Sequence, residues 1–144
     1  MDRRYLIVLG ALMTQFMIIG LFFVYSLLIK ELETEFGWSR TTLSIGASIA
    51  GMAMGVFAIM GGRLSDRFGP RIVLTFTGLI YGLGYASISQ ISEPWHLYLI
   101  CGLFLGVGMS THDVVTLGSI ARWFPNRKGL MTGVVKSGTA AGQV

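Results

Sequence analysis

The chain has 144 residues, of which 53% are hydrophobic and only 12% are charged, with 20 glycines and a net charge of +4. Soluble domains carry about twice that share of charge, so the composition excludes a water-soluble fold, and the apolar content excludes intrinsic disorder. A single cysteine, Cys101, excludes a disulfide framework and a cysteine-ligated zinc site. The charges fall in short clusters between long apolar stretches, which indicates membrane loops and not a nucleic-acid surface.

Five apolar stretches are predicted to form membrane helices. Residues 5–29 carry no charge, and this stretch is long enough to cross ~30 Å of hydrocarbon. This stretch is too long for a signal peptide and lacks a small-residue cleavage site, so we interpret it as a transmembrane helix. Three further transmembrane helices are predicted at 41–62, 72–92 and 95–121. A fifth stretch, 129–144, reaches only ~24 Å as a helix, so we expect a span that is cut short.

Lysines and arginines are unevenly divided between the two sides of these spans. The segments on the side of the N-terminus hold eight of them, and the opposite segments hold two. The positive-inside rule therefore predicts a multi-pass protein of the cytoplasmic (inner) membrane with a cytoplasmic N-terminus. The first outer loop is predicted to be acidic, with Glu31, Glu33 and Glu35. Glycines four residues apart favour close helix packing in a compact bundle; the pairs are Gly51/Gly55, Gly78/Gly82, Gly102/Gly106 and Gly138/Gly142.

A motif is predicted to form the tight connection between the second and third spans. The sequence from 62 to 71 reads GRLSDRFGPR, with Asp66 among three arginines. We expect Gly62 and Gly69 to adopt backbone angles closed to other residues, and Asp66 to hold the helices together through charge-assisted hydrogen bonds. This stretch resembles the signature loop of the major facilitator superfamily, G-x-L-x-D-R-x-G-x-R/K. The matching residues are Gly62, Leu64, Asp66, Arg67, Gly69 and Arg71.

A second motif follows the fourth span and resembles one branch of that superfamily. It is similar to the segment between spans four and five of the monocarboxylate and oxalate–formate transporter group. Its opening, Arg-Trp-Phe-Pro, is more similar to the bacterial organic-anion branch. The residues that carry the resemblance are Arg122, Trp123, Phe124, Pro125, Arg127, Lys128, Gly133 and Gly138.

The resemblance implies an all-α membrane protein, comprising the first four transmembrane helices and part of the fifth of a twelve-helix major facilitator fold. Residues 1–144 then form part of the N-terminal six-helix domain, and the C-terminal half is missing. The implied function is secondary transport of small organic anions by alternating access, with a proton or counter-anion as coupling partner. The implied role of Asp66, Arg67 and Arg71 is to gate the cytoplasmic side. Since no HExxH, GxSxG or P-loop motif is present, we expect neither an enzyme nor a metal or cofactor.

Ionisable side chains inside a span are costly unless paired or wet, so each suggests a functional site. Asp113 and Lys136 reach a similar depth, ~10–12 Å from the inner ends of adjacent antiparallel helices, which predicts an ion pair. The pair serves either structural neutralisation or a charge switch on the anion path. His112 either carries a proton in a wet cavity or is a neutral hydrogen-bonded side chain. Gln15 either contacts substrate or bonds a neighbouring helix, which is the commoner role.

A different class of protein is also compatible with four apolar spans. A small four-helix membrane scaffold or assembly subunit needs neither the signature loop nor the buried charges. The transporter hypothesis accounts for both features and is therefore preferred, with the lipid bilayer and a small molecule as its partners.

Overall fold

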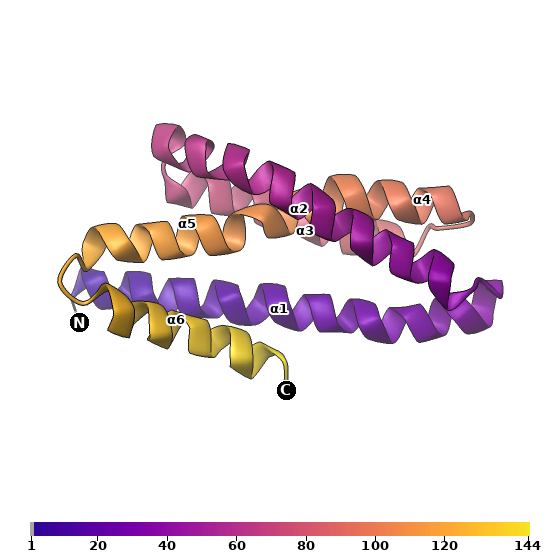
Figure 1. Ribbon diagram of the computed structural model, residues 1–144, viewed down its shortest axis with the longest axis horizontal. Coiled ribbons are helices and arrows are strands. Elements are labelled where there is room, and N and C mark those ends of the chain that lie inside the picture. The colour runs from indigo at the N-terminus through magenta and orange to yellow at the C-terminus, as the bar shows by residue number, and fades with distance from the viewer. Residues whose placement is uncertain (1) are drawn as a thin grey trace.

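The computed structural model describes residues 2–144, and their regular secondary structure is entirely helical (Figure 1). Four helical segments are long and apolar enough to cross a membrane, and the fourth of these combines α4, a π-helix (η1) and α5 without interruption. The sixth α-helix is shorter. The elements are α1 (Arg3–Phe36), α2 (Arg40–Phe68), α3 (Pro70–Ile88), α4 (Pro94–Leu99), η1 (Ile100–Gly106), α5 (Val107–Trp123) and α6 (Lys128–Gly142).

The first helix continues beyond the apolar stretch that predicted it. α1 reaches Phe36 and not residue 29, so the expected acidic loop is helical. It ends where Gly37 takes a left-handed conformation (φ 67°), and the Ser39 side chain then caps α2 by accepting from the Thr42 amide at 3.2 Å. The charge pattern predicted only the apolar part of the helix, and the helix continues past that part because glutamate is a good helix former.

The signature stretch 62–71 is mostly helical, which corrects the expectation of a loop. α2 extends to Phe68, so that Asp66 lies on its last turn, and only Gly69 forms the turn to α3, with φ 89°. The expectation for Gly62 is wrong because this residue is helical. A Cβ at Gly62 would lie 3.1 Å from Val114 Cγ1, so the missing side chain there allows α2 and α5 to approach. Pro70 begins α3, where its missing amide costs nothing.

Glycines create the closest helix contacts, although only some of the predicted pairs do so. A Cβ at Gly138 or Gly142 of α6 would lie 2.6 Å from a backbone oxygen of α1. Gly106 meets α2 in the same way, with its Cβ position 2.5 Å from Ala53 Cβ. The pairs Gly51/Gly55 and Gly78/Gly82 face open space within the structure.

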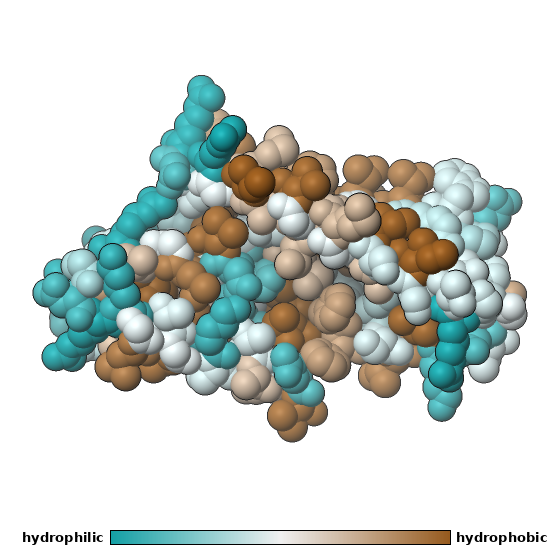
Figure 2. Space-filling view, viewed as in Figure 1, coloured by the Kyte–Doolittle hydropathy of each residue, from teal (hydrophilic) through white to brown (hydrophobic). Residues whose placement is uncertain are grey.

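Hydrophilic side chains gather at the two ends of the molecule, and most brown, hydrophobic side chains lie between them, together with a few hydrophilic patches (Figure 2). One end gathers the start of α1, the turn from α2 to α3 and the turn from α5 to α6 (Figure 1). Large apolar side chains such as Met52, Leu79 and Leu103 are exposed between the ends. A band of exposed apolar side chains is what a lipid environment requires.

Candidate functional site

Three helices bring polar side chains together inside the bundle. Lys136 of α6 donates from Nζ to Asp113 Oδ1 of α5 at 2.6 Å, so the predicted ion pair is present. The two side chains are 40% and 41% exposed within residues 2–144, so this part of the bundle encloses neither of them completely. The pair is therefore neither a sealed buried ion pair nor a fully solvated one.

Gln15 of α1 is fully buried and joins this pair to both neighbouring helices. Its Nε2 donates to Asp113 Oδ1 at 2.8 Å and to Thr116 Oγ1 at 3.0 Å. Its Oε1 accepts a hydrogen bond from the Thr139 hydroxyl of α6 at 2.9 Å. This geometry supports helix bonding as the role of Gln15. Thr139 was not predicted, although it lies three residues after Lys136 and hence on the same face of the helix.

His112 is also buried, at 4% exposure. Its Nδ1 is bonded to the Met109 carbonyl oxygen one turn earlier, and a carbonyl only accepts, so Nδ1 carries a hydrogen. Its Nε2 lies 3.6 Å from Asp113 Oδ1. His112 therefore stands beside the carboxylate as a third polar neighbour, after Lys136 and Gln15.

Four of these polar residues, His112, Asp113, Lys136 and Thr139, line an open cavity of about 380 Å³ between α1, α2, α5 and α6. Its other walls are apolar or small, which keeps the polar groups in a mostly apolar surrounding. A site with few polar groups on an apolar wall is the usual composition of a small-molecule site. The cavity is lined by Ile19, Phe22, Ala47, Ala50, Gly51, Met54, Met109, His112, Asp113, Lys136 and Thr139.

Replacing Gln15 with alanine is expected to destabilise the protein by about 1–3 kcal/mol, because Thr116 and Thr139 lose a buried partner. The matched control is Thr14→Ala, because the Thr14 hydroxyl bonds only Gly10 O of its own helix at 2.8 Å. Thermal unfolding in detergent measures both variants. Equal midpoints for the two would show that Gln15 does not hold the three helices together.

The two sequence motifs meet at one end of the bundle. Asp66 of α2 forms its ion pair with Arg122 of α5. We had expected partners among Arg63, Arg67 and Arg71, and none of these pairs with a carboxylate within residues 2–144. Adjacent residues on a helix point to different sides, so Arg67 cannot easily face Asp66. The expectation of a helix-linking aspartate therefore holds with a different partner.

The remaining residues of the two motifs lie on α2, α3, α5 and α6 and in the turn between α5 and α6. Arg67 stacks over the Phe68 ring at 5.4 Å, Leu64 is partly exposed, and Arg71 is exposed in the first turn of α3. In the second motif, Phe124 lies 6.2 Å from the Tyr5 ring, between α5 and α6. The others are placed as follows: Trp123 ends α5, Pro125 lies in the turn, Arg127 precedes α6, Lys128 begins it, Gly133 faces open space and Gly138 contacts α1.

Residues 9–144 match the family model of the Major Facilitator Superfamily. The chain belongs to this superfamily. It is 26% identical over 90% of its length to an uncharacterized MFS-type transporter, YhjX, of Escherichia coli K12, covering 32% of that protein. It is 31% identical over 75% of its length to MFS-type transporter 1 of an Ophiocordyceps species, covering 24% of it. It is 24% identical over 88% of its length to multidrug resistance protein MdtH of Shigella dysenteriae, covering 31% of it.

The superfamily assignment fits the architecture. Four membrane-length helices and a fifth, shorter one make this a multi-pass membrane protein, consistent with the N-terminal part of a major facilitator fold. The chain spans about a third or less of the length of these relatives.

Proposed function

We propose that the complete protein is a secondary transporter that carries small organic anions through the cavity beside Asp113 and Lys136. Superfamily membership supports transport, and Lys136 is the observation that supports an anionic substrate. Its ammonium lies in a mostly apolar cavity, where a charge-assisted hydrogen bond to a carboxylate is strong. The resemblance of 122–138 to the monocarboxylate and oxalate–formate group supports the same class.

The contacts around Asp113 suggest how Lys136 can change partners. A substrate carboxylate takes Lys136 Nζ from Asp113 Oδ1, and the same oxygen keeps the Gln15 amide donor at 2.8 Å. His112 Nε2 lies 3.6 Å from the same oxygen and is a second polar neighbour. Asp113 therefore retains polar partners when Lys136 turns to substrate. A proton or a counter-anion completes the coupling, and this pair is where either one acts.

The ion pair between Asp66 and Arg122 is proposed as a contact that opens and closes at one end of the cavity. It connects the α2–α3 turn to the α5–α6 turn, so relative movement of these helices breaks it. The uneven distribution of lysines and arginines supports a cytoplasmic location for this end and for the N-terminus. Both motif groups then lie on the cytoplasmic side.

Replacing Asp66 with asparagine is expected to reduce transport several-fold while the amount of protein in the membrane stays the same. Both side chains of the pair are more than half exposed, so its loss costs at most about 1 kcal/mol of stability. Initial uptake rates, normalised to membrane content by immunoblot, measure the effect. Arg63→Gln is the matched control, because Arg63 forms no ion pair within residues 2–144. Normal transport by the Asp66 variant would remove the proposed role.

The substrate class is tested by ligand stabilisation of the purified complete protein. A ligand that binds only the folded state raises the unfolding midpoint as its concentration exceeds the dissociation constant. We expect acetate, pyruvate or oxalate to raise the midpoint, and Lys136→Gln to abolish that rise. A rise with tetraphenylphosphonium, but with none of the carboxylates, would contradict an anionic substrate.

A lipophilic cation is the second candidate substrate, and one observation favours it. Asp113 opens into the same cavity, whose other walls include Phe22, Met54 and Met109. A carboxylate on an aromatic and thioether surface suits a cation, and one relative is named a multidrug resistance protein. The stabilisation experiment separates the two substrates. A membrane scaffold, from a different functional class, predicts stabilisation by neither.

A further inference from the structure

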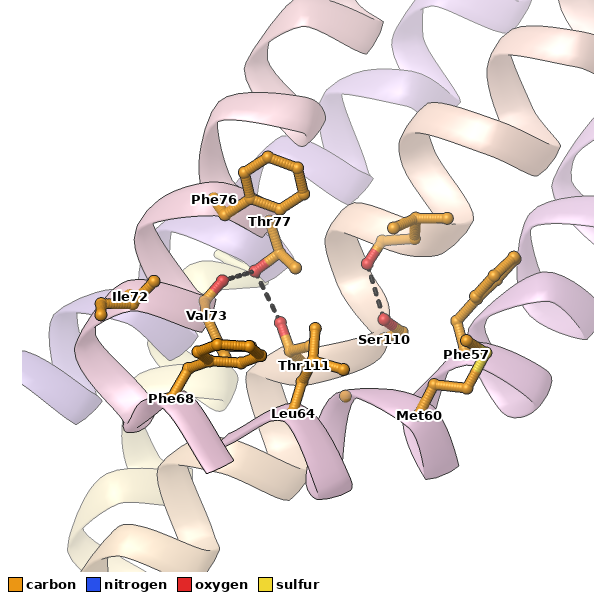
Figure 3. Close-up of a pocket in the computed structure, with 12 residues that line it drawn as sticks. Phe57, Met60, Leu64, Phe68, Ile72, Val73, Phe76, Thr77, Ser110 and Thr111 are labelled. Atoms are coloured by element: carbon orange, nitrogen blue, oxygen red, sulfur yellow. Dashed lines mark hydrogen bonds between the residues drawn. The ribbon is translucent and has the colours of Figure 1, made fainter. Parts of the chain in front are cut away.

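A second cavity lies away from the polar one and opens between α2, α3 and α5 (Figure 3). It has a volume of about 170 Å³, and exposed apolar side chains form its rim, among them Met60 and Ile72. It is lined by Phe57, Met60, Gly61, Leu64, Phe68, Ile72, Val73, Phe76, Thr77, Val107, Ser110 and Thr111. We call it the α2–α3 groove.

The hydroxyl groups in this groove are already bonded, so the groove presents an apolar surface. Thr77 donates to the Val73 carbonyl at 2.8 Å, and its hydroxyl lies 2.7 Å from that of Thr111 (Figure 3). Ser110 donates to the Val107 carbonyl at 2.6 Å. An occupant of the groove therefore gains by burying hydrocarbon and finds few free polar partners.

Positive charge lies at the end of the groove where α2 turns into α3. The guanidinium of Arg67 lies 5.4 Å from the ring of Phe68, which lines the groove. Arg63 and Arg71 precede two other lining residues, and all three arginines are exposed without a carboxylate partner within residues 2–144. The N-terminus of α3 begins at the same turn, and its dipole also favours an anion.

We propose that the α2–α3 groove binds an anionic phospholipid from the leaflet at the α2–α3 turn. One acyl chain lies along the groove, and the phosphate sits between Arg67, Arg71 and the start of α3. Charge and hydrocarbon lie side by side here, which is the combination that an anionic lipid presents. A free anion gains nothing from the apolar walls, and a zwitterionic lipid gains less from three uncompensated arginines. This site is separate from the transport cavity and does not depend on the substrate.

The test is native mass spectrometry of the complete protein in detergent, with phosphatidylglycerol or phosphatidylcholine added. We expect retention of phosphatidylglycerol over phosphatidylcholine, with no competition from millimolar inorganic phosphate or glycerol phosphate. Arg67→Gln with Arg71→Gln should weaken phosphatidylglycerol binding about five-fold for each arginine replaced. Met60→Trp should also weaken it by filling the groove. Met52→Trp is the matched control, because Met52 is also an exposed methionine of α2 (75%, against 54% for Met60) and lies outside the groove.

Four results would overturn the proposal. The first is equal retention of the two lipids, and the second is a preference that survives both the arginine and the Met60 replacements. The third is that the unaltered protein retains neither lipid, which would indicate that another part of the complete protein covers the groove. Displacement of phosphatidylglycerol by inorganic phosphate alone would show a simple anion site and would also contradict the proposal.

Discussion

The double variant Asp113→Asn with Lys136→Gln is expected to be stable but strongly impaired in anion transport. Removing both charges leaves no uncompensated ion in the membrane, and the amide side chains can still bond Gln15 and each other. The ammonium that we propose as the contact for the substrate carboxylate is nevertheless lost. A charge-assisted hydrogen bond contributes about 1.5–3 kcal/mol, so uptake at low substrate concentration should fall about 10- to 100-fold.

Two single variants at Lys136 separate loss of transport from loss of stability. Lys136→Gln alone leaves the Asp113 carboxylate without its ammonium, so it should lose both transport and thermal stability. Lys136→Arg keeps the charge and should retain part of the transport. Initial rates of carboxylate uptake and unfolding midpoints are measured for all four proteins. Recovery of normal uptake in the double variant would show that the pair serves only structural neutralisation.

The second large effect is expected at Gly138, where alanine should destabilise the protein by about 1–3 kcal/mol. The new Cβ would lie 2.6 Å from Leu12 O and 3.1 Å from Leu12 Cγ. The oxygen belongs to the α1 backbone, which cannot move without shifting the whole helix. Separation of α1 from α6 would also lengthen the bond between Thr139 and Gln15, so transport should decline along with the thermal unfolding midpoint.

Gly133→Ala is the matched control for this effect. Gly133 lies on the same helix, and no atom lies within 4 Å of its Cβ position. Alanine there should stabilise the helix by up to about 1 kcal/mol, because it restricts the unfolded chain more than glycine does. If both alanines change the midpoint equally, close approach of α6 to α1 is not what requires glycine at 138.

The apolar spans and the Asp113–Lys136 pair could be predicted because simple geometry determines them. A membrane helix needs an uncharged stretch that is long enough to cross the bilayer. This requirement identified the spans. Two charges at equal depth on adjacent antiparallel helices have few partners other than each other. The same reasoning failed at the helix ends, because α1 and α2 continue as helices after they leave the apolar region.

Contacts between distant segments could not be predicted in this way. Asp66 pairs with Arg122 and not with its neighbours in sequence, since the packing of α2 on α5 decides which arginine is near. Thr139 lines the cavity, and its bond to Gln15 depends on how α1 packs against α6. The π-helix at Ile100–Gly106 was not predicted, and this segment packs against both α2 and α3.

Counterflow of labelled oxalate shows whether the complete protein carries organic anions across a membrane. Proteoliposomes that contain the complete protein are loaded with unlabelled oxalate and diluted into a trace of labelled oxalate. The account predicts transient accumulation of label that is lost in the Asp113→Asn, Lys136→Gln double variant. The same experiment with acetate or pyruvate covers the monocarboxylates. No accumulation of any carboxylate, alongside accumulation of tetraphenylphosphonium, would contradict transport of organic anions through this cavity.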